Sequence, residues 1–227
     1  MSRVVRVEFT LEPKQEAFFV SEASELLYSG GFGGGKTLMV CLKGVARASD
    51  PRAVEVLARA RFEDVKDTIL PTLFEGSGDT PPVLPPGSYS WYKADKAIRI
   101  IDGGLIRYLG LGANRQRNLE KMRFRGQNVT GVGIDQLEEI SFEQYMNAQG
   151  RPRSAGRGLT RQVYGSCNPA APSHWLATRF GIKSGHDPRT TPSIRSSLTS
   201  NGLTTTLEAI LTSPMENPHL PLAHGIP

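Results

Sequence analysis

The chain has 227 residues, of which 38% are hydrophobic, and a formal net charge of +5; this length suffices for one sizeable α/β domain or two small ones. No run of about 18 apolar residues is present, so the sequence predicts no membrane-spanning helix. The two cysteines, Cys41 and Cys167, are too few for a disulfide framework and favour a reducing compartment, while the modest positive charge favours anionic partners such as nucleic acid.

The first third of the chain is expected to alternate helices with strands. Residues 16–28 are typical of a helix followed by a short strand that enters a glycine-rich segment. A helix is predicted from Thr37 to Ala48, because apolar residues recur there at helical spacing. Residues 53–58 are typical of a short buried strand, and residues 62–74 favour a helix that ends at Pro71.

The middle of the chain carries a loop, a hairpin and a further strand. Residues 76–88 are rich in Gly, Pro and Ser and are expected to form a loop. Two apolar segments, 97–101 and 105–109, are joined through Asp102-Gly103-Gly104 and predict a β-hairpin. A strand at residues 129–134 ends directly before Asp135.

The last third is expected to contain a helix at 143–149, a strand at 162–166 and a helix around Trp175. From Pro188 onward the chain is rich in Ser, Thr, Pro and Asn and has weak periodicity, which predicts an extension or linker. Strands that alternate with helices imply an α/β fold, with a mainly parallel central sheet flanked by helices.

The glycine-rich segment at residues 30–37 fits the pattern G-x-x-x-x-G-K-[ST]. Glycines allow successive backbone N–H groups to point at one anion, and the following helix adds the positive end of its dipole. In such a loop the lysine contacts the β- and γ-phosphates and the Thr hydroxyl binds Mg²⁺. The segment therefore predicts a site for ATP and Mg²⁺ built from Gly30, Gly31, Phe32, Gly33, Gly34, Gly35, Lys36 and Thr37.

Asp135 is the expected second carboxylate of this site. It follows an apolar strand, where an acid can support the Mg²⁺ that Thr37 binds. In many such ATPases a glutamate directly follows this aspartate and orients the attacking water, but here the next residue is Gln136. Either Glu138 or Glu139 is the candidate base, provided that the turn after the strand is tight.

Taken together, these motifs resemble those of one family, the ATPase domain of the large terminase subunit, which is the DNA-packaging motor of tailed bacteriophages. The resemblance spans roughly residues 11–180 and includes the phosphate loop. Its other elements are Leu11, Pro13 and Gln15; residues 66–70; the hairpin from Ile98 to Leu111; residues 123–126; Gly133 to Ile140; Ser166-Cys167-Asn168-Pro169; and His174-Trp175. The departure from the family pattern is Gln136 in place of the usual glutamate.

The resemblance implies a P-loop NTPase fold of the ASCE or RecA-like class, in which Gln15 contacts adenine. It also implies that Ser166 and Asn168 sense the γ-phosphate and link hydrolysis to movement. Family members act as homo-oligomeric rings on procapsids in the host cytoplasm, with the portal, the small terminase subunit and double-stranded DNA as partners. An arginine reaches the ATP of the neighbouring subunit and assists hydrolysis; the candidates here are Arg123, Arg125, Arg151 and Arg153.

The resemblance also suggests how the chain is divided. Residues 1–185 are expected to form the ATPase domain, and residues 186–227 an extension or linker toward an absent nuclease domain. Family nuclease domains hold two metals with clustered carboxylates, whereas after Glu143 this chain contains only Asp187, Glu208 and Glu216. Nuclease activity is therefore not expected in this chain.

Other classes of function fit parts of the sequence. A nucleotide-dependent assembly switch without useful hydrolysis is motivated by Gln136. A helicase-like DNA-repair ATPase is disfavoured by the short domain, by the absence of a second motor core and by the segment from Asn168 to Trp175. A small-molecule kinase is disfavoured because no arginine-bearing lid is evident, although the arginine-rich residues 151–161 leave room for it.

Overall fold

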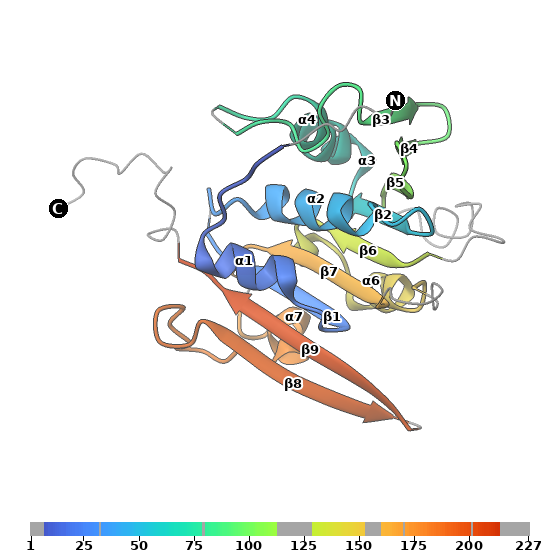
Figure 1. Ribbon diagram of the computed structural model, residues 1–227. Helices are drawn as coiled ribbons and strands as arrows, with labels where there is room; N and C mark the ends of the chain where they lie inside the picture. The colour runs from blue at the N-terminus through green and yellow to red at the C-terminus, as the bar shows by residue number, and fades with distance from the viewer. Residues whose placement is uncertain are drawn as a thin grey trace.

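In the part of the chain that the structure describes, nine strands form one sheet that runs through the molecule (Figure 1). The computed structural model describes residues 7–31, 33–78, 80–112, 129–152, 160–169, 171–200 and 202–213. The strands are β1 (Glu25–Ser29), β2 (Val54–Arg59), β3 (Tyr89–Tyr92), β4 (Ala97–Ile100), β5 (Leu105–Gly110), β6 (Gly131–Ile134), β7 (Gln162–Cys167), β8 (Ser193–Ser200) and β9 (Leu203–Leu211). Their order across the sheet is β3-β4-β5-β2-β6-β7-β1-β9-β8.

The centre of the sheet is parallel and its two ends are antiparallel. Strands β5, β2, β6, β7, β1 and β9 each pair in parallel with their neighbours in this row. The β3–β4–β5 meander closes one end of the sheet and the β8–β9 hairpin closes the other. The predicted α/β fold with a mainly parallel sheet is confirmed.

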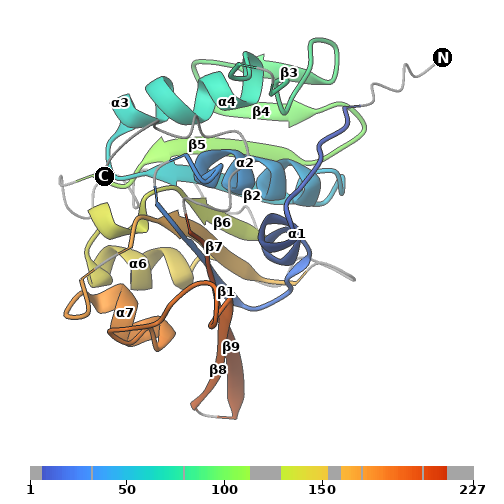
Figure 2. The same cartoon turned by 90° about the vertical axis from the view of Figure 1, so that its left-hand side faces the viewer.

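Helices cover both faces of the sheet (Figure 2). The helical elements are α1 (Pro13–Val20), α2 (Lys36–Arg47), α3 (Phe62–Asp64), the π-helical turn η1 (Val65–Ile69), α4 (Leu70–Phe74), the 3₁₀ turn η2 (Leu137–Glu139), α6 (Phe142–Gln149) and α7 (Trp175–Phe180). Alternate strand residues point to opposite faces, so Leu26 and Tyr28 join the core under α1, α2 and α4, whereas Leu27 joins the core under α6 and α7. Both faces of the parallel strands are therefore buried.

Pro71 does not end the helix that begins at Phe62, contrary to the sequence prediction. The π-helical turn η1 precedes it, and Pro71 lies in the first turn of α4, which continues to Phe74. A proline is tolerated in a first helical turn, because its missing N–H would have no helical partner there. The local widening at η1 therefore lets the helical segment run on.

The sequence predicted an extension or linker over residues 186–227. In the structure this part of the chain contains β8 and β9, which complete the sheet. Strand β9 pairs in parallel with β1 and buries Leu207, Ala209, Ile210 and Leu211. Among the described residues, β8 pairs with β9 alone and is largely exposed, which accounts for its hydroxyl-rich sequence. Figures 1 and 2 both show this hairpin projecting beyond the other elements. That this end of the chain leads toward a nuclease domain, itself absent from this chain, stays a prediction.

In the part of the chain that the structure describes, no helix has both the length and the apolar character needed to cross a membrane.

Candidate nucleotide-binding site

The phosphate loop connects β1 to α2, at the carboxyl edge of the parallel sheet. Gly33 and Gly35 have φ values of 74° and 70°, a region that glycine adopts at little cost. Through these residues the loop turns so that α2, a 12-residue helix, begins at Lys36. The free N–H groups and positive dipole of its first turn make this edge suited to a phosphate. Phe32 lies outside the described residues.

Lys36 lies against the loop that it is predicted to serve. Its ammonium group donates hydrogen bonds to the carbonyl oxygens of Gly30, at 3.0 Å, and Gly31. Burial lowers the pKa of Lys36, and the nearby carboxylates of Glu138 and Asp135 oppose that shift. Burial thus removes water from the ammonium group while two acidic side chains stabilise its charge.

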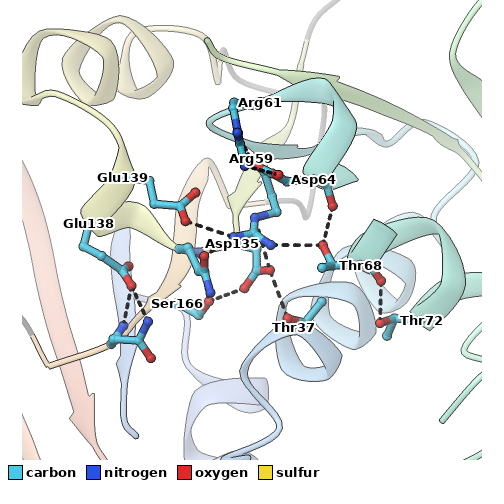
Figure 3. A network of polar contacts seen from close by, with 12 residues as sticks. Thr37, Arg59, Arg61, Asp64, Thr68, Thr72, Asp135, Glu138, Glu139 and Ser166 are labelled. Atoms are coloured by element: carbon cyan, nitrogen blue, oxygen red, sulfur yellow. Dashed lines mark hydrogen bonds and ion pairs between the residues drawn. The ribbon is translucent and has the colours of Figure 1, made fainter. Parts of the chain in front are cut away.

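Thr37 and Asp135 come together as the sequence predicted. The Thr37 hydroxyl donates to Asp135 Oδ2 at 2.9 Å, and the Ser166 hydroxyl donates to Asp135 Oδ1 at 2.6 Å (Figure 3). These residues come from α2, the end of β6 and the neighbouring strand β7, and the Asp135 side chain is buried. A hydroxyl and a carboxylate are the hard oxygen donors that Mg²⁺ prefers, so the residues present fit this ion.

Arg59, at the end of β2, was not singled out from the sequence, yet it connects the acidic residues of the site (Figure 3). Its guanidinium donates to Glu139 Oε1 at 3.2 Å and to Gln136 Oε1, and its Nε lies 3.8 Å from Asp135 Oδ2. It also donates to the Thr68 hydroxyl at 3.3 Å. The sequence feature that could have identified it is an arginine at the carboxyl end of an apolar strand, which is the edge where parallel sheets bind their ligands.

The two candidate glutamates lie in different surroundings. Gln136 adopts a left-handed conformation, with φ of 57°, and the chain then enters η2, so Glu138 and Glu139 diverge. Glu138 Oε1 accepts hydrogen bonds from the backbone and side-chain amides of Asn168, at 3.0 and 2.7 Å. Its Oε2 is buried and has no hydrogen-bond partner among the described residues. Glu139 is partly exposed and pairs with Arg59.

A cavity of about 370 Å³ lies beside the phosphate loop, at the start of α1. Gln15, the predicted adenine contact, lines it, and its Oε1 accepts a hydrogen bond from the Glu12 amide at 3.0 Å. The other lining residues come from the start of α1, from β1, from the loop and from the chain that follows β9: Glu12, Pro13, Lys14, Tyr28, Gly34, Thr212 and Ser213. Thr212 and Ser213 were missed because the hydroxyl-rich tail gave no sign of returning to the loop.

Of the four arginines predicted to act on a neighbouring subunit, the structure describes only Arg151. Arg123, Arg125 and Arg153 lie outside the described residues. Arg151 lies between α6 and Pro152. Pro152 and the first residues of β7 line a cavity at the edge of the sheet opposite the phosphate loop. A role in trans stays a prediction for all four.

By sequence, the chain matches no protein-family model and no curated protein. By structure, it is similar to the large terminase of a thermophilic bacteriophage in complex with ATP-γ-S, with a TM-score of 0.59 and 14% identity over 92% of this chain and 46% of that one. It is also similar to the large terminase ATPase domain of a Thermus phage, with a TM-score of 0.57 and 14% identity over 90% of this chain and 81% of that one. The chain thus spans less than half of the first of these two proteins. The fold of this chain is therefore that of the ATPase domain of bacteriophage large terminases, as the resemblance of its motifs predicts.

Proposed function

We propose that this chain is the ATPase domain of a bacteriophage large terminase, which hydrolyses ATP with Mg²⁺ and uses the energy to move double-stranded DNA into a procapsid. The observation that carries this proposal is the 2.9 Å contact between Thr37 and Asp135. It joins the phosphate loop to the acidic strand end in the arrangement that nucleotide hydrolysis requires. The similar fold of solved large terminases supports it.

The loop holds the nucleotide through its backbone and through Lys36. Backbone N–H groups of Gly33 to Thr37 bind the phosphates, and the Lys36 ammonium moves from the carbonyls of Gly30 and Gly31 to the β- and γ-phosphates. Thr37 and Asp135 would hold the Mg²⁺, which would neutralise charge on the phosphates. Gln15 binds the adenine in the adjacent cavity.

Glu138 is the residue that orients and activates the attacking water. Its Oε2 is buried without a hydrogen-bond partner in the described chain, and its charge stabilises the Lys36 ammonium, so it lies on the phosphate side of the acidic turn. A buried carboxylate oxygen without a partner is costly unless a ligand or water satisfies it. Glu139 is held on Arg59 and is more exposed, so it positions the turn instead.

Ser166 and Asn168 transmit the loss of the γ-phosphate. Ser166 donates to Asp135 and accepts a hydrogen bond from the Gln136 amide at 3.3 Å, while Asn168 holds Glu138. Ser166 lies near the end of β7 and Asn168 directly follows this strand, and α7 is the next helix along the chain. A change in the position of the base or of the metal ligand therefore passes to the segment of chain that leads from β7 to α7.

The remaining parts of the proposal concern the assembled motor. The protein acts in the host cytoplasm as a ring on the portal, together with the small terminase subunit, and an arginine from one subunit assists hydrolysis in the next. It grips DNA through the phosphate backbone, so binding is independent of sequence and weakens with salt. The large terminases that share the fold support this assignment.

Calorimetry and steady-state phosphate release test the proposal. The wild-type chain is expected to bind ATP with Mg²⁺ and release phosphate; Lys36→Ala should abolish release, and Asp135→Asn should remove the Mg²⁺-dependent part of the affinity. The exposed Lys183→Ala is the control for the loss of one positive charge. Absence of magnesium-dependent nucleotide binding by folded protein would refute the proposal. Binding without phosphate release, also with double-stranded DNA and at high protein concentration, would favour the assembly switch, and stimulation by single-stranded DNA alone would favour the repair ATPase.

A further inference from the structure

Thr212, the first residue after β9, lies directly on the first glycine of the phosphate loop. Its backbone amide donates to the Ser29 carbonyl at 2.7 Å, and its hydroxyl donates to the same oxygen at 3.2 Å. A Cβ atom built on Gly30 would lie 1.8 Å from Thr212 Oγ1. Gly30 is not among the glycines with positive φ. The contact with Thr212, rather than the backbone conformation, therefore requires a glycine at this position.

The phosphate loop thus begins between two strands from the last third of the chain. On one side the Gly30 amide donates to the Cys167 carbonyl at the end of β7, at 3.1 Å. On the other side Thr212 is buried against Ser29 and Gly30. Because Thr is branched at Cβ and its hydroxyl is hydrogen-bonded, this side chain has little freedom to turn away.

The same end of β9 forms a wall of the cavity that Gln15 lines. Thr212 and Ser213 line it together with Gly34. The segment around α1, whose first residues also line the cavity, is tied to the last third of the chain, because Lys14 donates to the Pro188 carbonyl at 2.9 Å and Ser21 donates to Glu208 Oε2 at 2.6 Å. Loop, cavity and β9 therefore form one contiguous unit.

We infer that Thr212 is a positioning residue for the phosphate loop, and that nucleotide binding is coupled to the docking of the end of β9. This inference rests on the proposed function, because it takes the loop to be a nucleotide site. Thr212 acts through Ser29 and Gly30 rather than on the phosphates. Whatever displaces the end of β9 weakens nucleotide binding, and nucleotide binding in turn holds the end of β9 in place, because such coupling is reciprocal.

A steric rescue experiment tests the positioning role. Gly30→Ala is expected to weaken the affinity for Mg·ATP, measured by calorimetry, by at least about tenfold. Adding Thr212→Gly should restore most of the loss, since the nearest Thr212 atom would then be the carbonyl oxygen at 3.5 Å from the new methyl group. Adding Thr212→Ala should restore less, since its Cβ would remain at 3.2 Å.

Gly34→Ala is the matched control within the loop. Its Cβ would lie 3.4 Å from the Gly31 carbonyl oxygen and 3.8 Å from Thr212 Oγ1, so Thr212→Gly should not improve its affinity. The inference is supported if Thr212→Gly restores the affinity for Mg·ATP in the Gly30→Ala chain but not in the Gly34→Ala chain. No recovery there, or equal recovery in both backgrounds, overturns it.

Two further measurements separate this inference from the proposed function. Urea unfolding without nucleotide should show that Gly30→Ala lowers the free energy of unfolding and that adding Thr212→Gly restores it. This result is expected even if the wild-type chain binds no ATP, and such a failure to bind would refute only the proposed function. Hydrogen exchange should show that Mg·ATP slows exchange of the Thr212 amide along with the loop amides. Protection of the loop amides without any change at Thr212 would overturn the coupling.

Discussion

Glu138 accepts two hydrogen bonds from Asn168, one from the backbone amide at 3.0 Å and one from the side-chain amide at 2.7 Å. Glu138 belongs to the turn after β6, and Asn168 follows the neighbouring strand β7. The contact therefore joins the acidic turn to the segment that resembles the coupling motif of large terminases. A carboxylate held in this way can shift when the end of β7 moves, without any large movement of the sheet.

Replacing Glu138 and Glu139 one at a time by glutamine should separate the roles of the two carboxylates. Glu138→Gln is expected to lower steady-state ATP hydrolysis by at least about a hundredfold, because a general base is lost, while the affinity for Mg·ATP is retained. Glu139→Gln should lower ATP hydrolysis by a smaller factor, because Glu139 forms an ion pair with Arg59. A larger loss in Glu139→Gln than in Glu138→Gln would reverse the assignment.

Arg59 should matter for stability as well as for catalysis. Arg59→Met leaves the buried Asp135 and the nearby Glu139 without their cationic partner. Removing one member of such a buried group is expected to cost about 3 kcal/mol of unfolding free energy in urea. Arg61→Met is the control, because the Arg61–Asp64 pair is exposed on the arginine side and should change stability little. Equal effects of the two substitutions would contradict this account.

Lys43 should give a stability that depends on pH. Its ammonium group is buried and donates to the carbonyls of Phe18, Phe19 and Ser21 at the end of α1. Burial, assisted by Arg47, lowers its pKa from 10.5 to about 8, against the opposing effects of Glu55, Glu208 and Glu22. Between these values the unfolded chain binds more protons than the folded one, so the free energy of unfolding should rise with pH.

The measurement is urea unfolding of the wild type and of Lys43→Met between pH 8 and pH 10.5. The wild type should gain stability relative to the variant as the pH rises, by at most about 3 kcal/mol. Taking the difference between the two chains removes the contributions of other titrating groups. If the difference in unfolding free energy between the wild type and Lys43→Met stays constant or falls as the pH rises, folding does not lower the pKa of Lys43.

The parts of the site that the sequence predicted are those encoded locally. The glycine loop with Lys36 and Thr37 is a contiguous motif, and Asp135 directly follows a short apolar strand, so both could be placed from neighbouring residues. Gln15 was placed by resemblance, and the structure sets it beside the loop.

The features that the sequence did not reveal depend on which strands are neighbours. Arg59 reaches Gln136 and Glu139 only because β2 pairs with β6. The different surroundings of Glu138 and Glu139 follow from the left-handed conformation of Gln136, which no propensity of glutamine favours. Thr212 reaches Gly30 only because β9 pairs with β1. Such long-range pairings leave no periodic signal in the residues themselves.

The contribution of β8 and β9 to folding can be tested by truncation. A chain that ends at residue 185 lacks β9 and the burial of Leu207, Ile210 and Leu211. Each buried aliphatic side chain contributes about 1.5–3 kcal/mol, so the total is a large part of the roughly 5–15 kcal/mol that typically stabilises a domain. We expect this chain not to fold, whereas a chain that ends at residue 213 should unfold cooperatively in urea. Equal stability of the two would show that β9 is dispensable.

The place of β1 in the sheet has a consequence for biosynthesis. β1 is made well before both of its neighbours in the sheet, β7 and β9. Its pairing closes long loops and must wait until β7 and β9 have been synthesised. Until then the nascent polypeptide carries an unpaired apolar strand, which makes it a natural client for chaperones that shield such segments.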